Sequence, residues 1–328
     1  MGNAFIQFRT VSKVFPGGVE AVRNLSLGIA EGETLVLLGT SGSGKTTTMK
    51  MINRLIEPTS GQIIIDGEDI MVQDPICLRR RIGYSIQSIG LFPHMTVAGN
   101  VAVVPRLLKW PGSRIGERVD QLLRMVGLEP DDFRDRYPAQ LSGGQRQRVG
   151  VARALAADPP IVLMDEPFGA LDPITREHLQ DEFIELESQI RKTVVFVTHD
   201  VFEAVKMGDR IALLDAGQLQ QLATPAELVE HPANEFVDQF LGQHRFQLSL
   251  LTSTIGAFGE IDAAAPEPAN ARLRLSARHS MVDALDEFKK SRLVELPVYR
   301  RGQYVGLLRK HTLLKTIAKS LGETGEQP

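Results

Sequence analysis

A glycine-rich run directly after an apolar one is the feature that most limits the folds open to this sequence. The run GTSGSGKTT, from Gly39 to Thr47, follows LVLL, and its Gly39, Gly44, Lys45 and Thr46 match the pattern G-x-x-x-x-G-K-[ST]. The preceding ETLVLLG is typical of a buried strand, and the following KTTTMKMINRL can form a helix with apolar residues at helical spacing. A strand, a glycine-rich loop and a helix in this order predict an α/β core with a phosphate-binding loop, or P-loop.

The chemistry of this loop favours a nucleotide. Glycines allow successive backbone N–H groups to surround a phosphate, and the helix N-terminus adds the positive end of its dipole. Lys45 is predicted to reach the β- and γ-phosphates of ATP, and Thr46 to hold Mg²⁺. The alternative, a glycine- and serine-rich turn that matches by accident, is disfavoured by the flanking strand and helix. The residues predicted to bind nucleotide here are Gly39, Thr40, Ser41, Gly42, Ser43, Gly44, Lys45, Thr46 and Thr47.

A second apolar run ends in two carboxylates. In PIVLMDEP, Ile161 to Met164 predict a buried strand, and Asp165 and Glu166 stand at its carboxyl end, where open α/β sheets place their chemistry. Asp165 is predicted to complete the Mg²⁺ shell, directly or through water, and Glu166 to orient or deprotonate an attacking water. An acidic turn is the alternative for either residue alone, but the pairing of both with a P-loop disfavours it.

The stretch LSGGQRQRVGVARALAADP, from Leu141 to Pro159, predicts a second anion site. Ser142 is a favourable N-cap, Gly143 and Gly144 leave backbone N–H groups uncovered, and an amphipathic helix follows Gln145. One γ-phosphate hardly needs two such sites from one chain. We therefore predict a head-to-tail homodimer in which the segment Ser142–Gln145 of each copy closes the nucleotide of the other.

Five motifs together resemble the ATP-binding subunit of an ABC transporter, in that family's order, from residue 4 to about 242. The family's glycine-rich loop and LSGGQ, from two subunits, sandwich ATP, which agrees with the two-site argument. The motifs are the run Gly39–Thr46, LSGGQ at Leu141–Gln145, MDEP at Met164–Pro167, GALD at Gly169–Asp172 and VTHD at Val197–Asp200.

The resemblance implies roles for four further residues. His199 matches the histidine that contacts the γ-phosphate, and Asp172 matches the loop that links the two nucleotide sites. Gln87 matches the glutamine that senses Mg²⁺ and the attacking water while its loop touches the membrane partner. Phe15 stands where the family keeps an aromatic ring for stacking on adenine, with a place in the core as the alternative.

Longer stretches are similar to importers of quaternary amines and related osmoprotectants, such as glycine betaine, choline, carnitine and proline. These stretches are YSIQSIGLFPHMTV, RYPAQLSGGQRQRVGVARALAADP and MDEPFGALDPITR. Importers of sulfate, polyamines, sugars and metals share much of them, so an ATPase for another solute, such as a polyamine, sulfate or an amino acid, is the alternative. The family implies integral membrane permease subunits and, indirectly, a solute-binding protein as partners.

The segment from Leu275 to Ile317 resembles a CBS domain, which osmoprotectant importers carry after the ATPase. It predicts a helix at Val282–Ser291, strands at Glu295–Tyr299 and Tyr304–Leu308, and a closing helix. CBS motifs usually work in pairs, and residues 241–271 are too few for a second copy. We therefore expect the single copy to pair across the ATPase dimer.

Charged residues are distributed unevenly along the chain. Residues 272–319 hold twelve Lys and Arg against four Asp and Glu, although the whole chain has a net charge of −3. The basic module is predicted to attract anionic lipid, at about 1 kcal/mol for each cation near the surface, and thereby to sense ionic strength. A solvated surface is the alternative. The remaining, acidic part lacks the basic face that nucleic acid requires, so we expect no nucleic-acid partner.

Location follows from what the sequence does not contain. No apolar run approaches the ~20 residues that span a bilayer, the N-terminus lacks a signal-peptide core, and the single Cys77 cannot form an internal disulfide. We expect a peripheral protein at the cytoplasmic face of the inner membrane, held there by its permease.

Together these features predict an ATPase that couples ATP hydrolysis to osmoprotectant import. A soluble ABC ATPase acting on DNA or ribosomes typically carries both ATPase halves or a long coiled coil, and neither is visible here. A small-molecule kinase would leave LSGGQ without a role. The predicted fold is a RecA-like α/β core with an antiparallel β-subdomain at residues 5–32 and an inserted helical subdomain at about 96–158, followed by a small α+β domain. The predicted divisions are 1–242 (ATP-binding), 243–271 (connecting segment, with a linker at 259–271), 272–320 (CBS-like) and 321–328 (tail).

Overall fold

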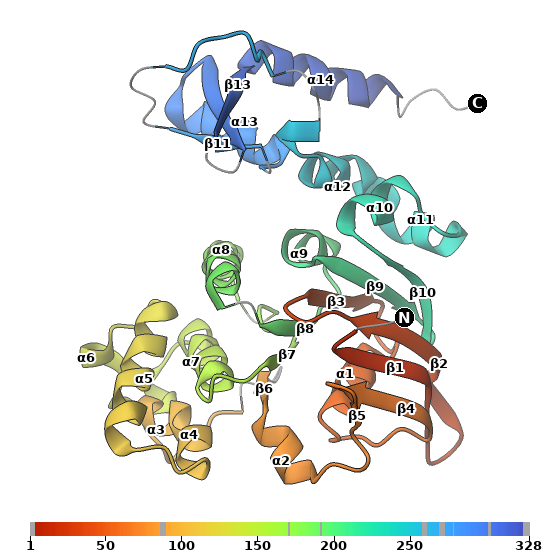
Figure 1. Ribbon diagram of the computed structural model, residues 1–328, viewed down its shortest axis with the longest axis vertical. Coiled ribbons are helices and arrows are strands. Elements are labelled where there is room, and N and C mark those ends of the chain that lie inside the picture. Colours follow the sequence, from red (N-terminus) through yellow and green to blue (C-terminus); the bar gives the residue numbers. More distant parts are fainter. Residues whose placement is uncertain are drawn as a thin grey trace. The chain divides into compact units, whose positions relative to one another are not determined.

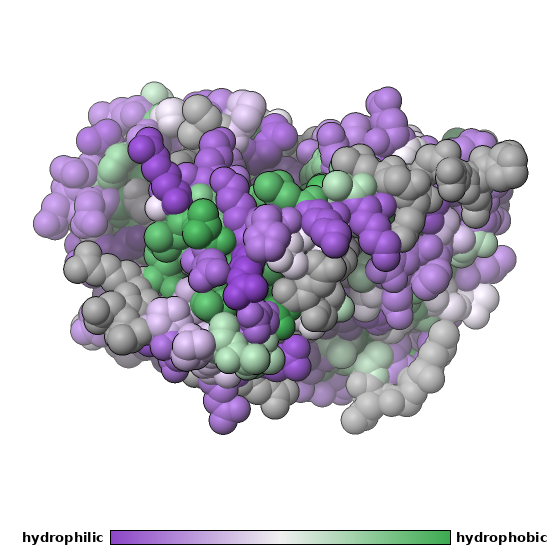
Figure 2. Space-filling model, turned by 90° about the horizontal axis from the view of Figure 1, so that it is seen from above, coloured by the Kyte–Doolittle hydropathy of each residue, from purple (hydrophilic) through white to green (hydrophobic). Residues whose placement is uncertain are grey.

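The structure, a computed structural model, describes residues 4–85, 90–169, 171–190, 192–257, 261–268, 273–277, 279–300 and 303–323. The chain divides into two compact units, Met1–Thr224 and Pro225–Pro328 (Figure 1). Hydrophilic side chains cover most of the face drawn in Figure 2, with hydrophobic residues visible between them. Most large apolar side chains instead lie in hydrophobic cores inside the units.

A six-stranded sheet of order β10-β9-β3-β8-β7-β6 forms the centre of the first unit. All neighbouring strands are parallel except β10, which runs antiparallel to β9. Every residue of β3, β7 and β8 is buried, as is typical of parallel strands covered on both faces. The carboxyl ends of these three neighbouring strands therefore meet at one edge of the sheet. The strands are β3 (Thr34–Gly39), β6 (Ile82–Ser85), β7 (Ile161–Asp165), β8 (Thr193–Val197), β9 (Arg210–Asp215) and β10 (Gln218–Ala223).

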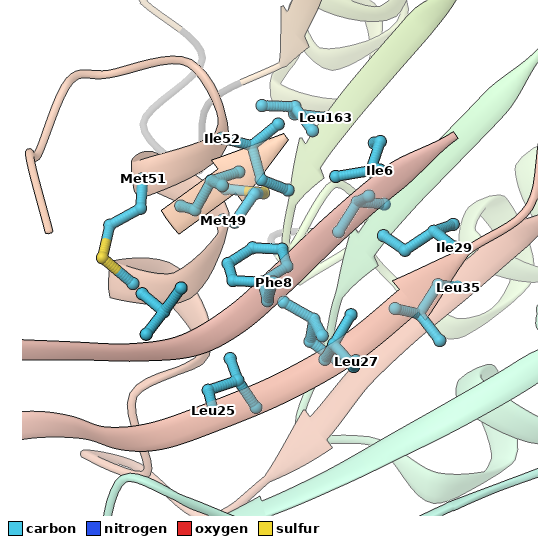
Figure 3. Close-up of a cluster of buried hydrophobic side chains, with 14 of the residues drawn as sticks. Ile6, Phe8, Leu25, Leu27, Ile29, Leu35, Met49, Met51, Ile52 and Leu163 are labelled. Atoms are coloured by element: carbon cyan, nitrogen blue, oxygen red, sulfur yellow. The ribbon is translucent and has the colours of Figure 1, made fainter. Parts of the chain in front are cut away.

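An antiparallel sheet of order β2-β1-β4-β5 accompanies the central sheet. The expected β-subdomain at residues 5–32 supplies only β1 and β2, and β4 joins from beyond the P-loop helix by pairing with β1. Phe8, Leu27, Met49 and Leu163 come from both sheets and that helix, and they meet in one core (Figure 3). Burial of each such side chain contributes about 1.5–3 kcal/mol. The strands are β1 (Ile6–Phe15), β2 (Val19–Ile29), β4 (Ser60–Ile65) and β5 (Glu68–Asp69).

The helices of the first unit lie between its strands along the chain. Helices α3 to α7 lie between β6 and β7 in the chain, where the sequence predicts the inserted helical subdomain at 96–158. In α5, Ile115, Val119 and Leu122 recur at helical spacing and are buried. The helices are α1 (Lys45–Ile52), α2 (Pro75–Arg80), α3 (Val97–Val101), α4 (Val103–Leu107), α5 (Gly112–Met125), α6 (Pro130–Phe133), α7 (Gly143–Leu155), α8 (Pro173–Ile190), α9 (Val201–Met207) and the short 3₁₀ turn η1 (Pro138–Gln140).

The second unit begins at Pro225, earlier than the predicted division at 242, because α10 packs against α12 and α12 against α13. Its sheet has the order β11-β12-β13. The core of this unit surrounds Phe288 of α13 and Leu296 of the sheet, both 0% exposed, and Leu250 of α12 packs against it. The elements are α10 (Pro225–Glu230), α11 (Glu235–Leu241), η2 (Gly242–His244), α12 (Arg245–Thr252), η3 (Ile255–Ala257), β11 (Leu275–Ser276), α13 (Met281–Ser291), β12 (Glu295–Arg300), β13 (Gln303–Arg309) and α14 (Lys310–Glu323).

The described part of the expected linker, residues 261–268, packs on this sheet. Asp262 forms an antiparallel bridge with Leu307 of β13, and Arg309 forms an ion pair with Asp262 at 2.9 Å. The Tyr299 hydroxyl donates to Glu267 at 2.7 Å. Residues 261–268 of the predicted linker, which is rich in alanine and proline, are thus an ordered part of the second unit. Within the described residues, no helix combines the length and apolar character needed to cross a membrane.

Candidate functional site

The P-loop joins β3 to α1, and close backbone approach shapes it. Gly39 (φ +149°) and Gly44 (φ +97°) adopt backbone angles that favour glycine. A Cβ on Gly44 would overlap the carbonyl oxygen of Ala21, and one on Gly39 would overlap that of Leu214. Only glycine therefore fits at these two positions, which lie against β2 and β9.

Lys45, the first residue of α1, folds back onto the loop. Its Nζ donates to the carbonyl oxygens of Gly39 and Thr40, at 2.8 Å each. Burial lowers the pKa of this ammonium, and the nearby carboxylates of Glu166 and Asp165 oppose that effect. The ammonium thus lies inside the loop, close to where the P-loop would hold a phosphate.

Thr46 and Asp165 meet although the chain separates them by more than a hundred residues. The Thr46 hydroxyl donates to Oδ1 of Asp165 at 3.0 Å, because β3 and β7 both pair with β8. Asp165 is buried, and burial raises the pKa of its carboxyl. A hydroxyl and a carboxylate are oxygen ligands of the kind Mg²⁺ prefers, so the pair fits the predicted metal.

Glu166 and His199 form the second pair at this edge. The His199 Nδ1 lies 3.3 Å from Oε1 of Glu166, and the two residues follow the neighbouring strands β7 and β8. Glu166 has a left-handed backbone (φ +46°), a strained conformation that cores avoid and functional sites retain. The imidazole is largely exposed, with 65% of its side chain accessible. A carboxylate and an imidazole in contact could orient a water molecule beside Lys45.

The segment Ser142–Gln145 builds a separate site at the start of α7. The Ser142 hydroxyl accepts from the Gln145 N–H at 3.2 Å, and the Gln145 side chain accepts from the Ser142 N–H at 3.0 Å. This capping box leaves space in front of the helix, since a Cβ on Gly143 would have no neighbour within 4 Å. A cleft of about 480 Å³ opens there, and we call it the signature cleft. Its lining residues are Gly127, Leu128, Phe133, Ser142, Gly143, Gly144, Gln145, Arg148, Leu171, Asp172 and Thr175.

The structure thus gathers the predicted residues into two groups. Lys45, Thr46, Asp165, Glu166 and His199 meet at the end of the central sheet. Ser142–Gln145 and Asp172 line the signature cleft, and no P-loop residue is in that lining.

Two predicted residues join neither group. Gln87 lies outside the described residues. Phe15 ends β1, is half-buried, and has Lys13 Nζ 5.2 Å from its ring centroid. Its predicted stacking on adenine stays a prediction.

Sequence reasoning missed the partners that surround these groups. Tyr84 of β6 lies near Asp165, and burial together with that carboxylate raises the pKa of its phenol to about 12. Gly217, in the β9–β10 turn, donates its N–H to the Ser43 carbonyl at 3.2 Å and accepts from the Arg23 N–H at 2.8 Å. A turn glycine and a strand tyrosine are common, so no sequence signal marked either residue.

A parallel sheet whose carboxyl edge carries a P-loop lysine, a hydroxyl–carboxylate pair and a glutamate–histidine pair defines a P-loop nucleoside triphosphatase. Comparisons with known proteins indicate which family within this class the chain resembles. Residues 22–169 match the family model "ABC transporter". The glycine betaine/carnitine/choline transport ATP-binding protein OpuCA of Bacillus subtilis is 59% identical over 240 residues, which cover 73% of this chain and 63% of that protein.

Two further matches cover more of the proteins concerned. The glycine betaine uptake system ATP-binding protein YehX of Escherichia coli is 53% identical over 247 residues, which cover 75% of this chain and 80% of YehX. The solved dimeric ATP-binding cassette MJ0796, in a post-hydrolysis state with ADP and Pi, is 37% identical with a TM-score of 0.61, and the match covers 67% of this chain and 98% of that one.

The chain belongs to the family of ABC transporter ATP-binding proteins. This confirms the family resemblance and the predicted cassette fold, a RecA-like α/β core with an antiparallel β-subdomain. The match spans less than two thirds of the length of OpuCA.

Proposed function

We propose that this chain is the ATP-hydrolysing subunit of a membrane importer and works as a head-to-tail homodimer. The observation that carries the proposal is that no P-loop residue lines the signature cleft, so the two predicted phosphate sites of one chain are separate. In the dimer, the P-loop of one copy and Ser142–Gln145 of the other would hold the same ATP. The similarity to a cassette solved as a dimer with ADP and Pi supports this arrangement.

Each residue at the carboxyl edge of the central sheet would have its own role in ATP hydrolysis. Lys45 would bind the β- and γ-phosphates, and Thr46 and Asp165 would hold Mg²⁺, which neutralises charge on the phosphates when bound. Glu166 would orient or deprotonate the attacking water, assisted by His199 at 3.3 Å. Gln87 would contribute to the Mg²⁺ and water site from its loop.

Mixing two inactive variants tests the shared site. Lys45→Ala removes the P-loop cation, and Gly143→Asp places a carboxylate in the signature cleft, where no atom obstructs its Cβ. Each variant alone should hydrolyse ATP very slowly. In an equal mixture, half of the dimers combine one intact P-loop with one intact signature cleft, so activity should return to about a quarter of the wild-type rate.

The control is a mixture of Lys45→Ala with itself at the same total concentration, which should stay inactive. Thermal unfolding should show that Gly143→Asp folds, because an acidic residue in the first turn of α7 favours the helix. Full activity of Gly143→Asp alone, or no recovery in the mixture, would refute the shared site.

For the solute, we propose a quaternary amine or related osmoprotectant. The support is the likeness to relatives named for glycine betaine, carnitine and choline transport. An importer of another solute, such as a polyamine, sulfate or an amino acid, is the alternative. ATPase activity of the reconstituted transporter should rise with glycine betaine or choline and its receptor, and stimulation by a polyamine alone would contradict this assignment.

The proposed partners are integral permease subunits and, through them, a solute-binding protein, which would place the chain at the cytoplasmic face of the inner membrane. A tagged full chain should co-purify with a polytopic membrane protein from solubilised membranes. Recovery only from the soluble fraction would favour a non-transport ABC ATPase.

We further propose that the C-terminal module is CBS-like and that it binds anionic lipid and senses ionic strength. Its helices and strands occupy the predicted positions, with α13 at Met281–Ser291 and β12 at Glu295–Arg300. Exposed cations support the lipid proposal, whereas Arg309 is already paired with Asp262 and Glu295. The exposed cations include Lys289, Lys290, Arg292, Lys310 and Lys315.

Vesicle flotation tests the lipid proposal. The full chain should float with vesicles of anionic lipid at low salt and detach as salt rises, because the Debye length falls from ~10 Å at 0.1 M to ~3 Å at 1 M. Replacing Lys289, Lys290, Lys310 and Lys315 by Gln should abolish flotation. Equal binding to zwitterionic vesicles would show that charge is not the cause.

A further inference from the structure

Glu203 is a buried carboxylate near His199 in the chain, and the proposed reaction assigns it no role. Glu203 lies in α9, four residues after His199, and is 7% exposed. Burial raises the pKa of its carboxyl, and a hydrogen bond from Thr198 opposes that effect. Because burial of a carboxylate costs free energy, the hydrogen-bond partners of Glu203 indicate its role.

The first partner leads to the histidine. The Thr198 hydroxyl donates to Oε2 of Glu203 at 2.7 Å and also accepts from the Asp200 N–H at 3.0 Å. These two bonds fix the residues on both sides of His199. The imidazole itself is largely exposed, so the backbone on either side has to hold it near Glu166.

The other partners lie on α8, which starts at the signature cleft. Gln180 donates to Oε1 of Glu203 at 3.1 Å, and Arg176 Nε lies 3.9 Å from the same oxygen. Arg176 also donates to the Leu171 carbonyl at 3.2 Å, and Leu171 lines the signature cleft. One carboxylate thus bonds both the histidine loop and the helix that borders the cleft.

We propose that Glu203 is a positioning residue: through Thr198 it holds His199 against Glu166, and through Gln180 and Arg176 it couples that position to the signature cleft. The inference rests on the proposed ATP hydrolysis. When the second copy fills the cleft and moves the Leu171 loop, Arg176 and Glu203 would transmit the shift to His199.

Steady-state hydrolysis by the full-length chain tests this with Glu203→Gln. The new amide can still accept from Thr198, but its NH₂ group then faces the donors of Gln180 and Arg176, so the link to α8 is lost. We expect kcat to fall roughly ten- to hundredfold, as a small displacement of a catalytic group can produce, with KM for ATP within about twofold. The double variant Glu203→Gln/Gln180→Glu restores a donor–acceptor pair and should recover most of kcat.

The matched control is Asp181→Asn, which removes another α8–α9 contact, the 2.7 Å ion pair with Lys206, and leaves Thr198 untouched. It should keep wild-type kcat. Wild-type kcat in Glu203→Gln would overturn the inference, as would equal losses in Asp181→Asn or no recovery in the double variant. A wild-type chain that hydrolyses no ATP would instead refute the proposed function itself.

Discussion

Single residues in the P-loop are constrained by backbone contacts with other strands, and Gly44 shows this most directly. We predict that Gly44→Ala destabilises the first unit by about 3 kcal/mol or more, since overlap with the Ala21 carbonyl adds to the cost of a left-handed backbone. Nucleotide binding should be lost as well. Urea unfolding and a fluorescent ATP analogue would measure the two effects.

Gly67 provides the matched comparison. It has φ +79°, and a Cβ there would meet nothing within 4 Å. Gly67→Ala should therefore cost only about 1 kcal/mol, the conformational part alone. Equal losses in the two variants would mean that close approach to Ala21 does not govern the loop.

Asp165, which we propose as an Mg²⁺ ligand, is predicted to lower the stability of the first unit at neutral pH. Its carboxyl is buried and its pKa is raised above the ordinary 3.8, so the folded chain binds more protons than the unfolded chain between these two pKa values. The resulting stability is fully present below pH 3.8 and is lost as pH rises through the folded pKa.

We therefore predict that Asp165→Asn raises Tm at pH 7 by roughly 2–4 °C, the effect of ~1 kcal/mol in a domain of this size. The amide can still accept from Thr46, so packing is kept, but ATP hydrolysis should stop because Mg²⁺ loses a carboxylate. Calorimetry across pH tests whether the ionised carboxylate is the cause, because the difference in Tm between Asp165→Asn and the wild type should then vanish in acid. A lower Tm at pH 7 would contradict it.

At the scale of elements, two helices begin with the same capping box but have different surroundings. In α7 the box joins Ser142 to Gln145 at the signature cleft, and in α13 it joins Ser280 to Asp283. Loss of either serine hydroxyl should cost about 1 kcal/mol of local stability. We predict that Ser142→Ala also slows ATP hydrolysis, whereas Ser280→Ala lowers only the stability of the second unit.

Hydrogen exchange of α7 and α13, measured beside the ATPase rate, separates the two effects. Each variant should exchange faster at its own helix. If Ser280→Ala slowed hydrolysis as much as Ser142→Ala does, the serine of α7 would have no special part in the nucleotide site.

At the scale of the whole molecule, the position of the division between the units predicts how the chain can be shortened. Leu250 and Ile255 pack into the core of the second unit, together with Leu275 and Phe288 of its sheet and helix. A fragment ending at 260 keeps the first two residues but loses their partners. A fragment ending at 224 cuts where the units divide.

We predict that fragment 1–224 is monodisperse and binds ATP, whereas fragment 1–260 self-associates through its exposed apolar residues. Size-exclusion chromatography with light scattering would decide. A well-behaved 1–260 beside an aggregated 1–224 would place the division near the predicted 242 instead.

Local features of this protein could be predicted from the sequence because they depend on neighbours in the chain. The P-loop, the capping serine of α7 and the limits of α13 (Met281–Ser291, predicted as 282–291) all follow from glycine angles, caps and apolar spacing. The position of Asp165 and Glu166 at the carboxyl end of β7 could be predicted because open α/β sheets place their functional residues there.

Only the tertiary structure decided which of these features meet. Strand order brings Thr46 to Asp165 and Glu166 to His199, and it keeps Ser142 in a separate cleft. Packing also places the alanine- and proline-rich segment near Asp262 on the sheet of the second unit. The physical reason is that such contacts depend on strand pairing and burial between residues far apart in the chain. The local conformational preferences of the sequence do not determine them.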